Sequence, residues 1–228
     1  EHFSKHPLSL ANVPEDELGN GYEYLIKQFA DDSGHTAQEF YTNRTLVHLM
    51  AQMLKPQPGE AVYDPTCGTG GMLISCVDQV RRNGGEHRSL KLYGQERNYT
   101  TASIAQMNCF LHGIEDAHIA QGDTLADPKF LDGKGHLRQF DIVLANPPYS
   151  IKWDGDANPL LINDPRFAPA GVLAPKSKAD LAFTLHMLHW LSTSGTAAIV
   201  EFPGVLYRGG AEQKIRQYLI DNNYVDAV

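Results

Sequence analysis

Cysteine is scarce in this chain, with three residues among 228. Cys67, Cys76 and Cys109 include no Cys-x-x-Cys pair. An odd number of cysteines without metal-ligand spacing predicts neither a disulfide framework nor a structural zinc site. We therefore expect a protein of a reducing compartment, with the cytoplasm as its location.

Long apolar runs are also missing from the sequence. No stretch approaches the roughly 20 apolar residues that span a bilayer. The first residues show no basic region followed by an apolar segment and a small-residue cleavage site. These absences exclude the membrane-protein class and predict a soluble protein that is not exported.

The chain has no excess of positive charge. Its 19 Lys and Arg residues stand against 27 Asp and Glu residues, which gives a net charge of −8. Proteins that hold nucleic acid through a broad basic face need clustered Lys and Arg to neutralise phosphates. A nucleic-acid substrate would therefore require a partner protein or a further segment.

The composition is otherwise that of a globular domain, with 42% hydrophobic and 20% charged residues. One domain is the expectation for this length. The chain begins at Glu1 without an initiator Met, and its last residues, YVDAV (224–228), have the pattern of a strand that is just starting. We expect a piece of a longer protein.

Apolar segments with helical and with strand periodicity alternate along the chain. Several expected strands are continuously apolar, which is typical of a parallel sheet with helices on both faces. The sequence thus predicts a Rossmann-like α/β fold, in which ligands bind beyond the carboxyl ends of the strands. Helices are expected at 22–30, 44–54, 70–82, 99–112, 179–191 and 210–221, and strands at 61–64, 90–95, 118–122, 140–145 and 196–202.

A glycine-rich segment, DPTCGTGGM (64–72), follows the first expected strand and precedes a helix. Glycines here allow a sharp turn and a close approach of the backbone to a ligand, although a turn chosen for packing alone is the alternative. A dinucleotide loop would need Gly where Leu73 stands, and a P-loop would need a Lys-Ser/Thr pair that is absent. The segment suits a nucleoside that carries a small zwitterion and no pyrophosphate.

Acidic residues mark the ends of three consecutive expected strands. Asp64 ends the first, Glu96 the second and Asp123 the third. A carboxylate at the second position can accept hydrogen bonds from both ribose hydroxyls, and Asp123 can accept one from an exocyclic amine of adenine. Each acid alone could be a solvated turn residue. Together the three outline one extended nucleoside pocket.

The fourth expected strand ends in the rigid sequence Asn146, Pro147, Pro148 and Tyr149. Proline restricts both its own backbone and that of the preceding residue, so the tip is stiff. The amide oxygen of Asn146 and the carbonyl of Pro147 can converge on one NH2 group, while Tyr149 offers a flat face to a planar base. Two preorganised acceptors would free the amine lone pair for attack and stabilise the positive charge that grows on it.

These motifs, DPTCGTGG and NPPY, resemble those of the class I S-adenosylmethionine-dependent methyltransferases, and in particular the adenine-N6 DNA methyltransferases. More narrowly, QEFYTNRTLVHLM (38–50) and the segments after residue 180 resemble the modification subunit of type I restriction-modification systems, so that the likeness covers nearly the whole chain. Asn43 departs from this pattern, because the family usually has proline there.

The resemblance implies roles for individual residues. The target adenine, extruded from duplex DNA, would be received by Asn146, Pro147, Pro148 and Tyr149. Glu96 would bind the ribose of S-adenosylmethionine and Asp123 its adenine. The rest of the cofactor would lie along Glu39, Phe40, Tyr41 and Thr42 and against Asp64, Gly68, Thr69, Gly70 and Gly71.

The resemblance also implies partners and an organisation. A specificity subunit and a restriction subunit are expected beside double-stranded DNA. Residues 1–35 would be a linker and a short helix left from an N-terminal helical region, and 36–228 a catalytic domain truncated at its C-terminus. The long stretch 150–178, rich in Asp, Asn and Pro, is expected to be a functional loop.

Other functions remain open at this point. The same tip would serve a protein-glutamine or guanine-amine methyltransferase, and the fold could be kept by a binding module without activity. His186 and His189 have a spacing that could bind a metal, but their apolar neighbours favour a core helix without a metal.

Overall fold

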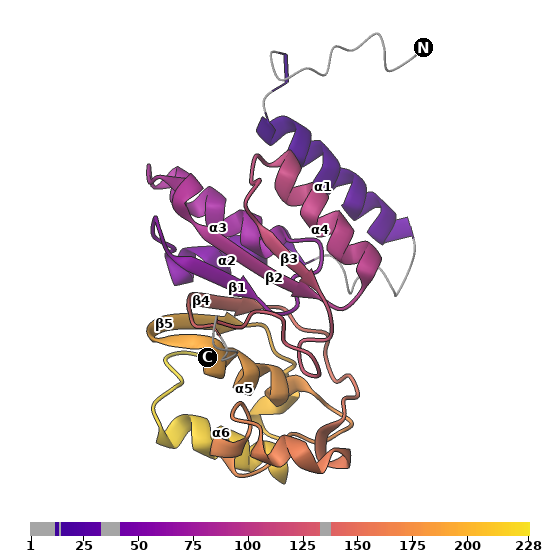
Figure 1. The fold of residues 1–228 in the computed structure, drawn as a ribbon, viewed down its shortest axis with the longest axis vertical. Helices are drawn as coiled ribbons and strands as arrows, with labels where there is room; N and C mark the ends of the chain where they lie inside the picture. Colours follow the sequence, from indigo (N-terminus) through magenta and orange to yellow (C-terminus); the bar gives the residue numbers. More distant parts are fainter. Residues whose placement is uncertain (1–11, 14, 33–41, 133–137) are drawn as a thin grey trace.

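The computed structural model describes residues 12–13, 15–32, 42–132 and 138–228 of the chain. A five-stranded sheet forms its centre, with helices packed on both faces (Figure 1). No helix within these ranges is both long and apolar enough to cross a membrane. The elements are α1 (Glu15–Asp32), α2 (Arg44–Leu54), β1 (Ala61–Asp64), α3 (Gly71–Arg82), β2 (Lys91–Glu96), α4 (Tyr99–Leu111), β3 (His118–Gln121), β4 (Phe140–Ala145), α5 (Asp180–Trp190), β5 (Leu191–Ile199) and α6 (Ala211–Asp221), with short 3-10 turns between them.

The strands lie in the order β3-β2-β1-β4-β5, and every neighbouring pair is parallel. Successive side chains point to opposite faces. Val62, Leu92 and Leu144 pack with α2 and α3 on one face. Tyr63 and Val143 pack with Trp190 of α5 on the other. Both faces are therefore covered, which explains why β1 is buried at all four positions and confirms the predicted parallel α/β fold.

Several boundaries differ from the sequence prediction, among them the end of β5 at Ile199 rather than at residue 202. Helix α1 begins at Glu15 rather than at residue 22, and β5 begins at Leu191 rather than at residue 196. Residues 224–228 form no strand in the structure. The expected strand start at YVDAV is therefore wrong for this chain.

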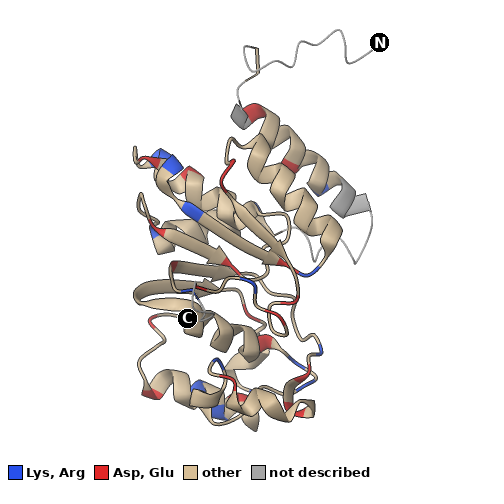
Figure 2. Ribbon diagram, viewed as in Figure 1, with Lys and Arg blue, Asp and Glu red and all other residues tan. Residues whose placement is uncertain are grey.

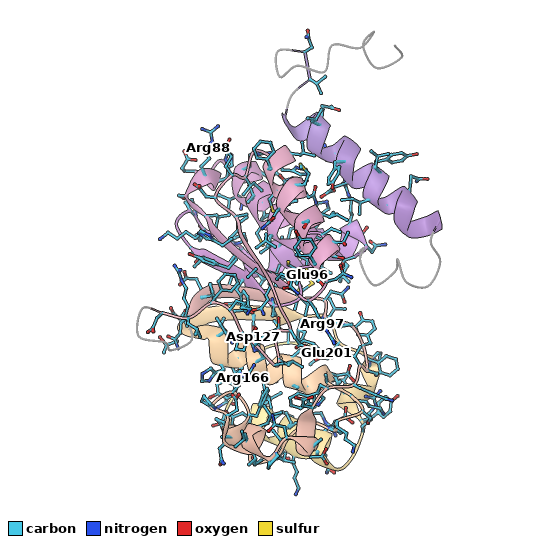
Figure 3. All side chains as sticks on the ribbon, turned by 45° about the vertical axis from the view of Figure 1, so that its right-hand side comes forward. Arg88, Glu96, Arg97, Asp127, Arg166 and Glu201 are labelled. Atoms are coloured by element: carbon cyan, nitrogen blue, oxygen red, sulfur yellow. The ribbon has the colours of Figure 1, made fainter. Side chains whose placement is uncertain are left out.

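The long segment 150–178 is ordered by three 3-10 turns, Gly155–Ala157, Pro159–Asn163 and Ala168–Ala170, and by a buried arginine. The Arg166 guanidinium donates to the carbonyls of Thr124 (3.1 Å) and Leu125 (2.9 Å), which follow β3, and to Asp164 (2.8 Å). It also donates to His186 Nδ1 at 3.2 Å. Figure 3 labels Arg166 below the sheet, where it ties the segment to β3 and α5.

His186 is fully buried in α5, as the core interpretation predicted. Because Arg166 donates to Nδ1, the ring proton is on Nε2, which lies 3.3 Å from the Tyr63 hydroxyl. Burial, together with the positive charge of Arg166, lowers the pKa of His186 well below its usual value. The histidine is thus a neutral link between loop and core.

Replacing Arg166 by Met should lower the free energy of unfolding by about 3–5 kcal/mol, since Asp164 and two carbonyls lose their donor. Urea denaturation followed by circular dichroism measures this change. The matched control is Arg88→Met, at an exposed position, with an expected effect within about 0.5 kcal/mol. Equal effects of the two substitutions would contradict the anchoring role of Arg166.

Candidate active site

The carboxyl ends of the parallel strands meet along one edge of the sheet, and polar side chains stand there. Asp64 is the last residue of β1 and Glu96 the last of β2, while Asn146 directly follows β4. Asp123 lies two residues beyond β3. The structure thus places four of the predicted site residues at the same edge.

The glycine-rich loop after β1 is held by backbone and side-chain hydrogen bonds. Gly70 has a φ of +82°, a left-handed conformation that favours glycine, and α3 begins directly after it. Its N–H donates to the Cys67 carbonyl at 2.8 Å. The Asn108 amide donates to the Thr69 carbonyl at 2.9 Å, which fixes the loop against α4.

Glu96 joins two of these segments. Its Oε2 accepts a hydrogen bond from the Gly68 N–H at 3.1 Å, and its Oε1 accepts one from the Asn98 N–H at 2.7 Å. One carboxylate therefore fixes both the glycine loop and the residue that caps α4. Each oxygen keeps a further lone pair for a ligand.

Asp64 is almost completely buried, and its Oδ1 accepts the Thr66 N–H at 2.9 Å. Burial raises the pKa of this carboxyl to about 7, and the negative charge of Glu96 adds to the increase. The more exposed Asp123 accepts the N–H groups of Leu125 and Ala126 through Oδ1. Its Oδ2 lies 3.6 Å from Arg97 Nε.

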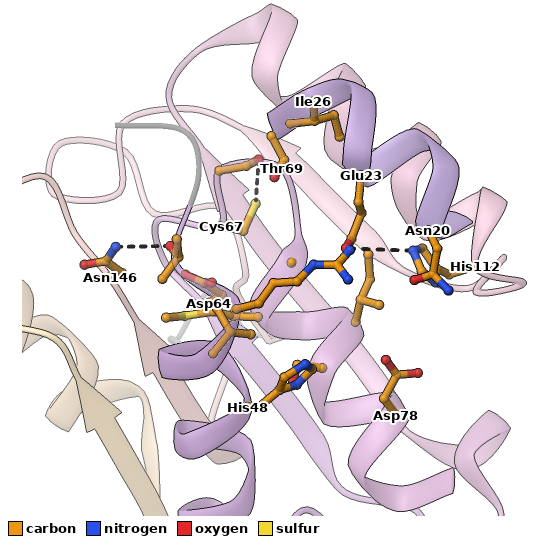
Figure 4. Close-up of a pocket in the computed structure, with 18 of the residues that line it drawn as sticks. Asn20, Glu23, Ile26, His48, Asp64, Cys67, Thr69, Asp78, His112 and Asn146 are labelled. Carbon is orange, nitrogen blue, oxygen red and sulfur yellow. Dashed lines mark hydrogen bonds and ion pairs between the residues drawn. The ribbon is translucent and has the colours of Figure 1, made fainter. Parts of the chain in front are cut away.

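Two adjoining cavities run along this edge. One, of about 480 Å³, is lined by Glu96, Asp123 and Pro148. The other, of about 310 Å³, is lined by Thr42, Asp64, Thr69 and Gly71 and continues between α1, α2 and α3 (Figure 4). Thr66, Gly68 and Asn146 line both. The two cavities therefore bring most of the predicted site residues together around one elongated space.

The second cavity extends beyond the predicted residues. Glu23 of α1 forms an ion pair with Arg44 of α2 in its wall, and His48 Nδ1 lies 3.0 Å from the hydroxyl of Ser75. These contributions could not be predicted from the sequence, because they depend on how α1 packs against α2 and α2 against α3. The expected residues Glu39, Phe40 and Tyr41 lie outside the described residues.

The Asn-Pro-Pro-Tyr tip is held from both sides. Asn146 Nδ2 donates to the Thr42 hydroxyl at 3.1 Å, and the Tyr149 hydroxyl donates to Asn146 Oδ1 at 2.9 Å. Ser150 has a φ of +52°, and its N–H donates to the buried Asp180 at 2.6 Å. This strained residue is stabilised by Asp180, which in turn accepts a bond from Arg208 at 3.2 Å.

One aromatic side chain, Phe202, lies beside the tip. Tyr149 is 46% exposed, and the centroid of its ring lies 6.5 Å from that of Phe202. The Arg208 guanidinium lies 5.0 Å from the Phe202 ring. Pro147 and Tyr149 line neither of the two cavities, so the tip faces the cavities with Asn146 and Pro148 and presents Tyr149 to solvent.

The buried Asp64 predicts a dependence of stability on pH. Because its pKa is raised from 3.8 to about 7, the folded state keeps a proton that the unfolded state releases above pH 4. The stabilisation of the folded state by this proton is fully present below pH 4 and is lost as the pH rises through 7. Asp64→Asn cannot ionise and keeps the oxygen that accepts the Thr66 N–H. Its stability relative to the wild type should rise by on the order of a few kcal/mol between pH 4 and pH 8 in urea titrations. Parallel curves for the two proteins would contradict the raised pKa.

Comparison with solved structures identifies the fold. A type I restriction-modification system methyltransferase subunit from Streptococcus thermophilus superposes with a TM-score of 0.84 at 40% identity, covering 96% of this chain and 46% of that one. A class I S-adenosylmethionine-dependent methyltransferase from Listeria monocytogenes, only 16% identical, superposes with a TM-score of 0.73 over 94% of this chain and 62% of its own. The predicted class I methyltransferase fold is confirmed.

Sequence relatives agree with the structural ones. The type I restriction enzyme MpnII methylase subunit of Mycoplasma pneumoniae is 45% identical over 93% of this chain, and the HindI methylase subunit of Haemophilus influenzae is 32% identical over 99%. The chain spans 40% and 49% of their lengths. The family model described as N-6 DNA Methylase matches residues 13–228. This chain therefore belongs to the N-6 DNA methylase family, as its motifs predicted.

Proposed function

We propose that this chain binds S-adenosylmethionine and transfers a methyl group to the N6 amine of adenine in DNA, as the catalytic part of a type I modification subunit. One observation carries the proposal. The nucleoside-type acids and the Asn146 tip line adjoining cavities that share Thr66, Gly68 and Asn146. S-adenosylmethionine bound along this edge would thus lie next to Asn146, the residue proposed to bind the amine that accepts the methyl group.

The residues of the edge fit this cofactor. The Thr66 hydroxyl, at the junction of the two cavities, is shielded from solvent and has no hydrogen-bond partner among the described residues. Such a group is a candidate ligand contact. In the proposed complex Glu96 accepts from the ribose hydroxyls and Asp123 from the adenine amine. The loop from Gly68 to Gly71 and Thr42 face the methionine part, for which Glu39, Phe40 and Tyr41 also stay predicted contacts.

The bound cofactor supplies an electrophilic methyl group on a positively charged sulfur. The chain's own residues prepare the amine that accepts it. Asn146 Oδ1 and the Pro147 carbonyl accept hydrogen bonds from the two N–H groups of the amine, which makes the N6 lone pair available for attack and stabilises the charge that develops. The nitrogen releases one of its protons to water as it gains the methyl group. Tyr149 stacks on a base extruded from the duplex. Asn146 Oδ1 has two lone pairs, so it can accept a hydrogen bond from the amine as well as the one from the Tyr149 hydroxyl.

DNA and protein partners belong to the proposal too. Lys and Arg are dispersed among acidic residues over the described chain, and Figure 2 shows no continuous basic face in this view. The net charge of −8 also opposes DNA binding by this part alone. We assign most of the DNA contact to other parts of the full-length subunit and to a specificity subunit, with a restriction subunit completing the system. Relatives named as methylase subunits of type I restriction enzymes favour this function over glutamine or guanine methylation and over an inactive binding module.

Calorimetry on the full-length subunit tests the cofactor site. S-adenosylmethionine should bind, and Glu96→Gln should weaken binding about 10- to 100-fold, because charge-assisted hydrogen bonds to the ribose are lost. Glu115→Gln, at an exposed position away from the edge, is the control. A folded wild type that binds no cofactor would refute the assignment.

A methyl-transfer assay with the specificity partner and duplex DNA tests the tip. Asn146→Ala should leave cofactor binding within about 3-fold and reduce transfer at least about 1,000-fold, since it removes a preorganised acceptor of the amine. Asn163→Ala, at an exposed position, is the control. Transfer at the wild-type rate by Asn146→Ala would exclude the proposed role.

A further inference from the structure

A fifth polar side chain, Glu201, stands at the carboxyl edge beside the tip. Strand β5 pairs with β4, and the Val200 N–H extends this pairing by donating to the Ala145 carbonyl at 2.9 Å. Glu201 therefore lies two residues beyond the end of β5, as Asp123 lies two residues beyond β3. Figure 3 labels it below Glu96, on the side of the edge away from β2 and β3.

The hydrogen bonding of Glu201 is incomplete. Its Oε1 accepts the Thr184 hydroxyl at 2.7 Å, which fixes the carboxyl group against α5. Its Oε2 is shielded from solvent and has no hydrogen-bond partner among the described residues. An unsatisfied polar atom of this kind is costly and calls for a partner that a ligand could supply.

The surroundings favour the neutral form of this carboxyl. Burial raises the pKa of Glu201 to about 7. The negative charges of Asp180 and Glu212 add to the increase, whereas contacts with the Thr184 hydroxyl and the Phe202 N–H oppose it. The only arginine described in contact with these acids, Arg208, donates to Asp180 and to Glu212, each at 3.2 Å. At neutral pH a large fraction of Glu201 therefore carries a proton that it can donate.

Glu201 also lies close to the surface proposed for the base. Burial raises the pKa of the Tyr149 hydroxyl, and the negative charge of Glu201 raises it further. The next residue, Phe202, packs its ring near that of Tyr149. Glu201 lines neither of the two cavities, but it directly precedes the residue whose ring borders the Asn-Pro-Pro-Tyr tip.

We propose that the Glu201 carboxyl group, through its Oε2 that is unpartnered in the described part of the chain, donates a hydrogen bond to a ring nitrogen of the target adenine, N1 or N7, and so selects and orients the base. This inference rests on the proposed function. In adenine the N6 amine lies between two ring nitrogens, N1 and N7, that act only as hydrogen-bond acceptors. The two N–H groups of the amine can therefore donate to Asn146 and Pro147 while Glu201 donates to one of these ring nitrogens. Guanine presents an N–H donor at N1 beside its amine, and this donor would meet the carboxyl proton.

Two substitutions separate this role from packing. In the full-length subunit with its specificity partner, Glu201→Leu should lower kcat/KM for duplex DNA about 10- to 100-fold at pH 7, because the ring nitrogen loses its donor. Glu201→Gln keeps a donor and an acceptor for Thr184, so it should recover most of this loss. The wild-type value should fall as the pH rises through 7, whereas that of Glu201→Gln should stay level.

Substrate analogues provide a test that needs no variant to fold. Duplexes with 1-deazaadenine or 7-deazaadenine at the target position each lack one ring nitrogen. One of the two should lower the wild-type rate about as far as Glu201→Leu does and should cause no further loss in that variant. Losses that add, or no loss with either analogue, would overturn the inference.

Two measurements distinguish a failure of the proposed function from a failure of the proposed Glu201 contact. Calorimetry should give the same affinity for S-adenosylmethionine in wild type, Glu201→Leu and Glu201→Gln. A wild type without transfer refutes the proposed function. A wild type and a Glu201→Leu variant that transfer equally well refute only the contact of Glu201 with the base.

Discussion

The whole site depends on the parallel alignment of the strands. Because each strand runs in the same direction, the residues after β1, β2, β3, β4 and β5 meet at one edge. Hydrogen bonds then link the neighbours: Glu96 fixes the loop after β1, and Arg166 fixes the residues after β3 to the segment that follows β4. The edge is therefore a connected framework rather than a row of independent loops.

The fold was largely predictable because the strands and helices carry strong apolar patterns. The start of β5 was missed for a physical reason. Residues 192–195, Ser-Thr-Ser-Gly, have the composition of a turn, yet they lie in the strand, where the pairing with β4 shifts register between Phe140 and Ile142. Gly195 approaches β4 so closely that an added Cβ would lie 2.8 Å from the Asp141 carbonyl oxygen. Tertiary contact thus overrode the local signal.

The length of α1 was missed for a related reason. Gly19 and Gly21 lower its helical propensity, so only residues 22–30 had a clear pattern. The structure explains Gly19, because a Cβ there would lie 2.6 Å from the ring of His112. The glycine allows α1 to pack against the end of α4, and this packing closes the second cavity. No local pattern predicts such an approach between distant segments.

Ligands bind beyond the carboxyl ends of parallel strands, so candidate site residues could be predicted wherever the end of a strand was predicted correctly. Asp64, Glu96, Asp123 and Asn146 were predicted as site residues in this way, and the structure places them at one edge. Glu201 was counted inside a strand expected to reach residue 202. Only the structure shows that Glu96 accepts a hydrogen bond from the glycine loop and that the Tyr149 hydroxyl donates one to Asn146.

The buried carboxyl of Asp64 has one more consequence. In the proposed reaction the sulfur donor enters as a cation and leaves as an uncharged thioether. The ionised form of Asp64, paired with no cation in the described structure, attracts the former and has no such attraction for the latter. Binding of the cationic donor would therefore lower the pKa of Asp64, whereas binding of the uncharged product would not.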